Sequence, residues 1–402
     1  MTGGPRATGI EALLATREIV VFCGSGGVGK TSTAAAAALA AATNFDARVL
    51  VVTIDPARRL ANALGLESFG NVERRIPDDL LRAAGIHARG ELYAAMLDTK
   101  RSWDDLVLRH APNEETAYRI LDNRMYHNVT SRFVQSHDYI AMERLYDIHA
   151  TGSYDLIVID TPPTRNAIDF LDAPKRMADF FGGRLLRWLT MPYRIGGRRG
   201  ARMFNLAGKP FYTLADRVLG GQFLQDIAEF FLNFETMYSG FIERAQAVER
   251  LLHDRRTTFA VVTTLEGAPL REAEFFCEEL TTRGYHLGAL LLNKTLPALL
   301  LADDGASAAA ALEADADSVA AELKETVPAL ADPTSTARVL RTIAASYRNF
   351  AVIAQREAEL RAELERLPDV VVTIPELEGD ITDLEGLAAI GRYLLGANPD
   401  RQ

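Results

Sequence analysis

The segment "VVFCGSGGVGKTST" (residues 20–33) joins a short apolar run to a glycine-rich loop and then to a run of helix-forming residues. Residues 24–31 fit the pattern G-x-x-x-x-G-K-[ST], in which a loop between a strand and a helix holds the phosphates of a nucleotide. Glycines let backbone amides approach the phosphate oxygens, and the helix adds the positive end of its dipole. The segment therefore predicts a nucleotide-binding strand–loop–helix unit.

Each residue of this loop has a predicted contact with a nucleoside triphosphate. Lys30 would place its ammonium group on the β- and γ-phosphates, which makes it a candidate catalytic residue, and the hydroxyl of Thr31 is suited to Mg²⁺. The other predicted nucleotide contacts are Gly24, Ser25, Gly26, Gly27, Val28, Gly29 and Ser32. The pattern alone does not distinguish kinases, GTPases and ATPases.

Two aspartates end predicted strands and are candidates for the chemistry. Asp160 ends "YDLIVID" (154–160), where a carboxylate beside the phosphate loop can hold Mg²⁺ through water. Asp55 ends "RVLVVTID" (48–55) and is a second carboxylate that can orient or deprotonate an attacking water. For each aspartate the structural alternative is a helix cap.

The rest of the chain alternates apolar strands with helices, which is typical of a mostly parallel sheet covered on both faces. Strands are predicted over residues 18–23, 48–55, 90–97, 154–160, 258–264, 287–294 and 369–374. We expect an α/β P-loop NTPase fold in one ATPase domain over residues 1–402. Its sheet core would be built from about residues 17–98, 154–174, 256–294 and 369–397.

Three stretches interrupt this alternation. Residues of about 99–150 and 175–255 carry no strand signal and predict helical inserts. An acidic, alanine-rich segment over about residues 302–334 is of low complexity, and we expect it to be mobile. An amphipathic helix then follows from about Thr336 to Glu365.

The second insert contains a stripe of large apolar residues at helical spacing. The stripe consists of Phe223, Ile227, Phe230, Phe231, Phe234, Met237 and Phe241. Such a stripe either faces a core or lines an apolar groove for a hydrophobic client, because exposed aromatic and Met patches mark binding sites. Both interpretations stay open at the level of sequence.

The composition limits the other functions that the chain could have. Its formal net charge of −10 argues against nucleic acid as the main partner, because phosphate binding needs a basic face. No apolar run reaches the ~18 residues of a membrane span, and no signal peptide is visible, so we expect a cytoplasmic protein. A basic segment over residues 183–204 is either a solvated loop or a contact with an anionic membrane surface, which leaves peripheral membrane association open.

Three separated segments together resemble one family. They are the phosphate loop, "TIDPARRLANALG" (53–65) and "VIDTPPTRNAIDFLDAP" (158–174). With them the chain resembles the anion-transporting ATPases, a family of deviant Walker A (SIMIBI-type) ATPases. This family includes the arsenite-pump subunit and the Get-pathway ATPase that carries tail-anchored membrane proteins. The last segment is similar to the bacterial, especially actinobacterial, Get-like branch, and the similarity spans nearly the whole chain.

The resemblance implies ATP as the nucleotide and gives roles to further residues. Asp55 would be the catalytic carboxylate of the first switch, and the "DTPPT" of the third segment would be the second switch. Asn293 would read adenine, for which an amide donor and acceptor are suited. The segment "IPELEGD" (374–380), with Pro375 and Leu377, resembles the loop that closes over the purine.

The chain also departs from the family. It has no CxxC, so a zinc-clamped dimer is not expected, and its two distant cysteines, Cys23 and Cys277, cannot supply the thiolate trio that arsenite needs. The lysine that the family places after the first glycine is Ser25 here. In the family this lysine reaches across a dimer to the phosphates of the opposing subunit.

The sequence therefore favours a Mg-ATP-dependent dimeric switch ATPase that holds a hydrophobic or membrane-protein client. We expect it to be half of a heterodimer with a lysine-bearing paralogue and slow on its own. A self-pair, in which Arg58, Arg59 or Arg165 replaces the missing cation, is the alternative. The second hypothesis is a regulatory or scaffold subunit that binds ATP. An arsenite-type pump subunit is less favoured. The negative net charge disfavours an ATPase that partitions DNA.

Overall fold

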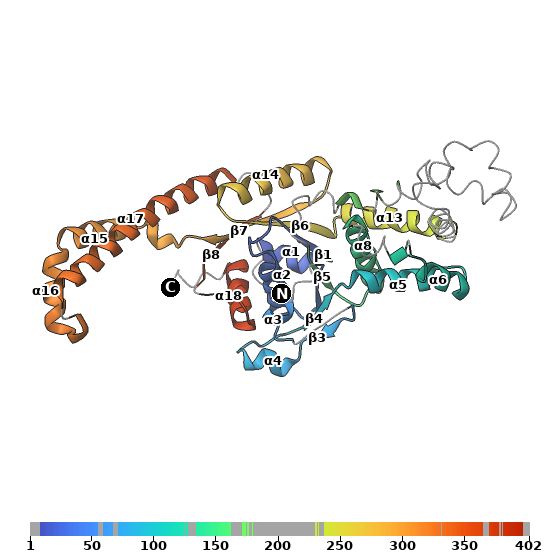
Figure 1. Ribbon diagram of the computed structural model, residues 1–402, viewed down its shortest axis with the longest axis horizontal. Coiled ribbons are helices and arrows are strands. Elements are labelled where there is room, and N and C mark those ends of the chain that lie inside the picture. The colour runs from blue at the N-terminus through green and yellow to red at the C-terminus, as the bar shows by residue number, and fades with distance from the viewer. Residues whose placement is uncertain are drawn as a thin grey trace, which may run out of the picture.

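The computed structural model shows one sheet with helices on both faces (Figure 1). The structure describes residues 9–54, 59–66, 71–124, 126–127, 134–161, 171–173, 175–176, 179, 230, 232, 237–330, 332–364, 370–377, 379 and 381–396. Within this part of the chain, no helix is both long enough and apolar enough to cross a membrane.

The sheet has eight strands in the order β3-β4-β2-β5-β1-β6-β7-β8. The strands are β1 (Ile19–Cys23), β2 (Arg48–Thr53), β3 (Arg74–Arg75), β4 (Glu91–Met96), β5 (Leu156–Asp160), β6 (Thr257–Thr263), β7 (Leu287–Thr295) and β8 (Val370–Pro375). All neighbouring strands are parallel except β3, which pairs antiparallel with β4. The predicted α/β fold with a mostly parallel sheet is confirmed.

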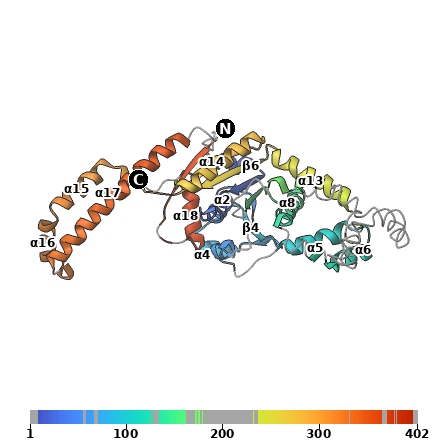
Figure 2. The same ribbon diagram turned by 45° about the horizontal axis from the view of Figure 1, so that its top comes forward.

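Two helical layers cover this sheet, one on each face (Figure 2). The first layer consists of α1 (Ile10–Thr16), α2 (Lys30–Asn44), α3 (Arg59–Ala63), α4 (Asp78–Ala83) and α18 (Leu384–Leu394). The second consists of α8 (Val134–Ala150), α13 (Tyr238–His253) and α14 (Gly267–Thr282). Successive residues of β1 alternate between the two cores, because side chains in a strand point to opposite faces.

The helix after the phosphate loop, α2, is buried along its length because its residues are small. Its alanines let it lie close to the sheet on one side and to α18 on the other. A Cβ atom added to Gly391 of α18 would lie 3.3 Å from the Cβ of Ala40, so only glycine fits this crossing without a shift. This packing fixes the helix whose first turn forms part of the predicted site.

The first helical insert builds a separate small core. Its helices are α5 (Thr99–His110) and α6 (Glu114–Leu121), which pack with α8 and α13. Trp103, Tyr126 and Tyr139 are the largest side chains of this core. Phe230 and Met237 of the predicted apolar stripe are also buried in it, at 1% and 3% exposure. At these two positions the stripe faces a core.

The other members of the stripe do not test the client-groove interpretation. Phe223, Ile227, Phe231 and Phe234 lie outside the described residues, and so does the side chain of Phe241. The basic segment over residues 183–204 also lies outside them.

Truncating Phe230 to alanine should lower the free energy of unfolding by about 3–5 kcal/mol, the usual cost of removing a large buried aromatic side chain. Urea denaturation followed by circular dichroism measures this loss. Leu108→Ala on α5 is the matched control, because Leu108 is half exposed and surface truncations change stability by about 0.5 kcal/mol or less. An unchanged urea midpoint for the Phe230 variant would contradict its place in the core.

A buried ion pair joins the helices of this insert. Arg244 of α13 pairs with Glu143 of α8, and the hydroxyl of Tyr139 donates to Glu143 at 3.0 Å. Arg244 also donates to Nδ1 of His110 in α5, at 3.0 Å. Burial raises the pKa of Glu143, an effect that the positive charge of Arg244 opposes. Burial and the same arginine lower the pKa of His110. The pair thus holds three helices in one arrangement.

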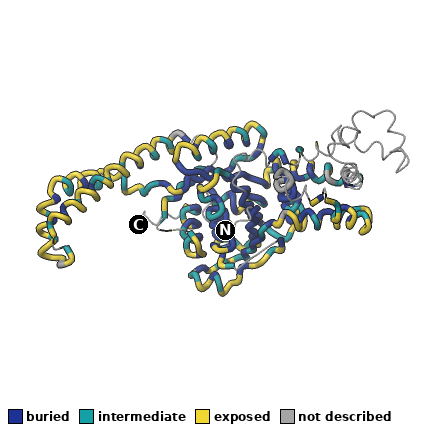
Figure 3. The backbone as a smooth tube through the Cα atoms, viewed as in Figure 1, coloured by how far each residue is buried: buried dark blue, intermediate teal, exposed yellow. Residues whose placement is uncertain are grey.

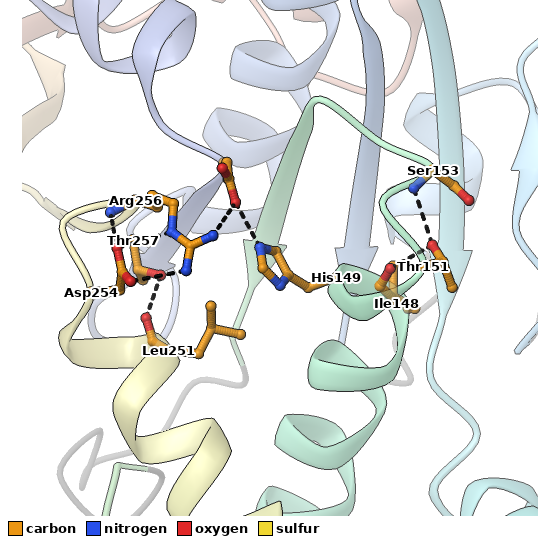
Figure 4. Close-up of polar contacts among 9 residues, drawn as sticks. Ile148, His149, Thr151, Ser153, Leu251, Asp254, Arg256 and Thr257 are labelled. Atoms are coloured by element: carbon orange, nitrogen blue, oxygen red, sulfur yellow. Dashed lines mark hydrogen bonds and ion pairs between the residues drawn. The ribbon is translucent and has the colours of Figure 1, made fainter.

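At the amino ends of the strands, a charged cluster joins three segments that are distant in the sequence (Figure 4). The carboxylate of Glu18, just before β1, accepts from His149 of α8 at 2.7 Å and from Arg256, just before β6, at 3.3 Å. Arg256 also pairs with Asp254, and its hydrogen bonds lower the pKa of that carboxyl group to about 2. This edge is occupied by structural contacts, and it lies opposite the predicted nucleotide site.

An arm of helices projects from the sheet beyond β7 (Figures 1 and 3). It contains α15 (Asp303–Ala314), α16 (Ala316–Thr326) and α17 (Pro333–Leu364), with the short 3-10 helices η1 (Ala298–Leu301) and η2 (Pro328–Leu330). The segment of about residues 302–334, whose mobility stays a prediction, is thus largely helical. The reason is that alanine is the strongest helix former and that Ala316 and Ala320 pack closely on Ala337 of α17.

Candidate nucleotide-binding site

A cavity of about 580 Å³ opens at the carboxyl edge of the sheet. The phosphate loop after β1, the end of β7 and the loop after β8 all line it. In open α/β sheets the ligand binds outside the carboxyl ends of the strands, because the loops there are free to carry functional residues. The predicted site is therefore assembled from segments far apart in the sequence.

Two glycines of the phosphate loop have no room for a side chain. Gly24 has a φ of +149°, and a Cβ on it would lie 2.1 Å from the carbonyl oxygen of Val262. Gly29 has a φ of +88°, and its Cβ would lie 2.2 Å from Nδ2 of Asn293. The glycine pattern is thus required by the close approach of β6 on one side and of β7 on the other.

Lys30 starts α2 and is held against the loop. Its side chain is only 6% exposed, and its Nζ donates to the carbonyl oxygen of Gly24 at 3.2 Å. Burial raises the pKa of the Cys23 thiol, and the nearby positive charge of Lys30 opposes this rise. A buried cation at the first turn of a helix is the arrangement that binds phosphate groups.

Asp160 accepts two hydroxyl hydrogen bonds at the end of β5. Thr31 Oγ1 donates to its Oδ2 at 2.8 Å, and Thr53 Oγ1 donates to the same oxygen at 2.9 Å. Thr53 and Asp160 face each other in the pairing of β2 with β5. The hydroxyl of Thr31 and the carboxylate of Asp160 are hard oxygen donors beside the phosphate loop, and such donors fit Mg²⁺.

Asn293 and the loop after β8 form the side of the cavity where the sequence predicts the base. Asn293 is buried, and its Nδ2 donates to the carbonyl oxygen of Val28 at 2.8 Å. This bond fixes the amide so that its oxygen serves as an acceptor, as recognition of the amino group of adenine requires. Pro375 and Leu377 line the same cavity, as the sequence predicts.

The structure brings most of the predicted residues to this cavity. Its lining includes Ser25, Gly27, Gly29, Lys30, Thr31, Ser32, Asn293, Pro375 and Leu377. Gly24 and Val28 are joined to it through the hydrogen bonds of Lys30 and Asn293, and Gly26 lies exposed in the same loop. Asp55, Arg58 and Arg165 lie outside the described residues, and so does the side chain of Arg59 at the start of α3.

Two residues that the structure places at the site were not identified from the sequence. Thr53 directs its hydroxyl to Asp160, and Lys294 lines the cavity with its Nζ 3.4 Å from the carbonyl oxygen of Gly27. The position of Thr53, two residues before the predicted catalytic Asp55, was the available signal for the first. Lys294 directly follows the predicted base-reading Asn293, which was the signal for the second.

Neither cysteine is in a state suited to bind a soft ion. Burial raises the pKa of the Cys23 thiol well above its usual range, with a further increase from Cys277. Burial also raises the pKa of Cys277 to about 12. Burial therefore disfavours the thiolate form of both residues, and a thiolate is what binds arsenite or a metal.

This fold and this site define a P-loop nucleoside triphosphatase. Residues 17–311 match the family described as "Anion-transporting ATPase", and the chain belongs to this family. The membership places it among ATPases, which agrees with the resemblance that its three motifs carry.

Individual proteins are also similar to this chain, at low sequence identity. ATPase BagA of Mycobacterium tuberculosis is 23% identical over 405 residues, which cover 98% of this chain and 97% of that protein. ATPase get3 of Aspergillus terreus is 25% identical over 275 residues, or 68% of this chain and 72% of that protein. The ATPase ASNA1 homolog of Entamoeba dispar is 23% identical over 292 residues, or 70% and 77% of the two chains.

Proposed function

We propose that this chain is a Mg-ATP-dependent switch ATPase that works as a dimer and holds and releases a hydrophobic client. The observation that carries the proposal is that one cavity joins Lys30 and Thr31 on its phosphate side to Asn293 on its base side. The likeness to ATPase get3 supports a role of the targeting type, and putative arsenical pump-driving ATPases of Aquifex aeolicus are similar to this chain as well. The choice of a hydrophobic client over arsenite rests on the cysteines, which are both buried.

The chemistry follows from the residues around the phosphate loop. The backbone amides of the loop and the ammonium group of Lys30 hold the phosphates, and the helix dipole of α2 adds to their charge. Thr31 and Asp160 would hold Mg²⁺, which would supply positive charge next to the phosphates. Thr53 keeps the carboxylate of Asp160 in place through its 2.9 Å hydrogen bond. Asp55, by resemblance to the family, orients the attacking water.

Asp55→Asn should separate ATP binding from hydrolysis. Asparagine keeps the size and hydrogen bonding of the side chain but removes the carboxylate, so the Kd for Mg-ATP should stay within about twofold. Hydrolysis should slow by about 10²–10⁴-fold, the usual contribution of a positioned base. Single-turnover phosphate release and calorimetric binding measure the two quantities.

The matched control for this variant is Asp46→Asn, since Asp46 is an exposed aspartate just before β2. The control should leave both quantities unchanged. Equal losses of binding and hydrolysis in the Asp55 variant would assign Asp55 a structural role.

The client is tested by what stimulates turnover. If the proposal holds, a peptide with the sequence character of a transmembrane helix raises the rate of ATP hydrolysis, whereas duplex DNA does not. Anionic vesicles without peptide distinguish a membrane surface from a hydrophobic client. Turnover that responds to none of the three would favour the regulatory or scaffold subunit instead.

The dimer partner that we propose is a paralogous ATPase subunit with a lysine at the position of Ser25. The hydroxyl of Ser25 is buried in the cavity wall and has no hydrogen-bond partner among the described residues. Serine carries no charge and is too short to reach an opposing subunit. A self-pair would therefore lack the bridging cation at both sites, whereas a heterodimer would have it at one.

A further inference from the structure

Lys294 has a backbone conformation that lysine rarely adopts. Its φ is +56°, and it is the one non-glycine residue with a positive φ within the described ranges. In this left-handed region the Cβ atom crowds the backbone, which costs energy for every residue with a side chain. Such strain persists only where the surroundings hold it, and it concentrates at ligand sites.

The strained backbone changes where the lysine side chain points. In a regular strand, neighbouring side chains point to opposite faces of the sheet. Here the register of β7 with β8 shifts between Leu292 and Thr295. As a result, both residues between them reach the phosphate loop. Nδ2 of Asn293 lies 2.8 Å from the carbonyl oxygen of Val28, and Nζ of Lys294 lies 3.4 Å from that of Gly27.

Two consecutive side chains of β7 thus hold two consecutive carbonyl groups of the phosphate loop. The loop has glycines with positive φ at Gly27 and Gly29, and such residues lose the most conformational freedom when they are ordered. The hydrogen bonds from Asn293 and Lys294, one on each side of the Val28 residue, restrict the loop before a nucleotide binds. The loop and the base-reading end of β7 therefore behave as one unit.

The stem of Lys294 also forms part of the cavity wall. The residue is exposed and lines the cavity, so its four methylene groups run from the end of β7 along the wall toward Gly27. Such a stem presents apolar surface while its charged end stays hydrated. Pro375 and Leu377 add apolar surface to the same cavity. A flat purine is the part of a nucleotide that such surfaces fit.

We propose that Lys294 is a positioning residue of the nucleotide site. Its ammonium group ties the phosphate loop to the end of β7, and its aliphatic stem forms one wall of the space for the base and ribose. The inference rests on the proposed ATP-binding function and adds to it a residue to which the phosphate-loop motif gives no role.

Two variants of the full chain separate the stem from the charge. Lys294→Gly removes both and relieves the strained φ, whereas Lys294→Met keeps an apolar stem and removes only the ammonium group. The binding of three ligands is then measured by calorimetry. ATP reports on the whole nucleotide site, AMP on the base side and inorganic tripolyphosphate on the phosphate side. The melting temperature is measured for each variant without ligand.

For Lys294→Gly we expect AMP to bind about tenfold more weakly because the apolar wall is lost, and ATP about 30- to 100-fold more weakly because the ammonium group is lost as well. The melting temperature should stay unchanged or rise, because glycine adopts a positive φ at no steric cost. For Lys294→Met we expect AMP to bind within about twofold of the wild type. Tripolyphosphate and ATP should weaken about threefold to tenfold, the net worth of one typical hydrogen bond.

Lys324→Met on α16 is the charge-matched control, because Lys324 is exposed on the arm, and it should bind all three ligands like the wild type. Wild-type binding of AMP and ATP by Lys294→Gly would overturn the inference. So would a fall in its melting temperature with equal losses for all three ligands, which would assign a structural role. A wild-type chain that binds neither ATP nor tripolyphosphate would instead refute the proposed function itself, before any variant is compared.

Discussion

Lys30→Met should weaken the binding of Mg-ATP by about 10²–10³-fold. The ammonium group is buried at the first turn of α2, 3.2 Å from the carbonyl oxygen of Gly24, in the wall of the cavity. Methionine has a similar length and fills the same space without the charge. Removing one partner of a desolvated charge pair costs about 3–4 kcal/mol of binding, and each 1.4 kcal/mol is tenfold in Kd.

The same variant should not unfold the protein. Taking an ammonium group out of water costs free energy in the folded chain, so an apolar side chain of similar length at this position should keep or raise the melting temperature. Lys100→Met is the control, because Lys100 is exposed on α5 and pairs only with Asp104 of the same helix, among the contacts described for it. Titration calorimetry with Mg-ATP compares the two variants. An unchanged Kd for the Lys30 variant would refute the assignment of residues 24–31 as the phosphate loop.

Most of the strands could be predicted because they are short apolar runs, of which β1, β5 and β6 are buried on both faces. The prediction over residues 90–97, for example, corresponds to β4 at Glu91–Met96. Strand β3 could not be predicted in this way, because it consists of two exposed arginines. It forms because it pairs with β4 and because Arg75 makes ion pairs with Asp78 and Glu91. These are tertiary contacts that local composition does not show.

The helical arm shows a second reason why amino-acid composition alone does not predict structure. An alanine-rich acidic segment is equally typical of a low-complexity linker and of a helix, because alanine is both small and the best helix former. The outcome depends on a partner, and α17 supplies one. Arg341 and Arg348 of α17 pair with Asp317 of α16 and Glu313 of α15. Two of the acidic residues that suggested a solvated segment therefore contact α17, while their side chains stay exposed at the surface.

The phosphate side of the site was visible in the sequence because its residues lie next to one another in one motif. Thr53 was not, because its role depends on the pairing of β2 with β5, which sets it opposite Asp160. Lys294 was not, because a positive φ at a strand end leaves no trace in residue type. Both missed residues act through geometry that arises only when distant segments come together.

Adding a lysine-bearing paralogue should raise ATP hydrolysis at the site of this chain by about 10³–10⁵-fold. A cation supplied by a second subunit to a phosphoryl-transfer site is worth this much in rate, or roughly 4–7 kcal/mol of barrier. This chain has Ser25 at the position from which the family supplies that cation. The partner's lysine would complete the site built on Lys30 and Asp55, while the partner's own site would face Ser25 and stay slow.

Five measurements of phosphate release distinguish this heterodimer from a self-pair. The purified chain alone should be slow, and the mixture with the paralogue should be fast. Changing the paralogue's lysine to alanine should remove the increase, and Asp55→Asn in this chain should remove it as well, because the fast site lies here. Ser25→Lys should raise the rate of the chain alone, since it would restore the cation at both sites of a self-pair. Fast hydrolysis by the unmodified chain would refute the heterodimer and would make Arg58, Arg59 and Arg165 the residues to replace next.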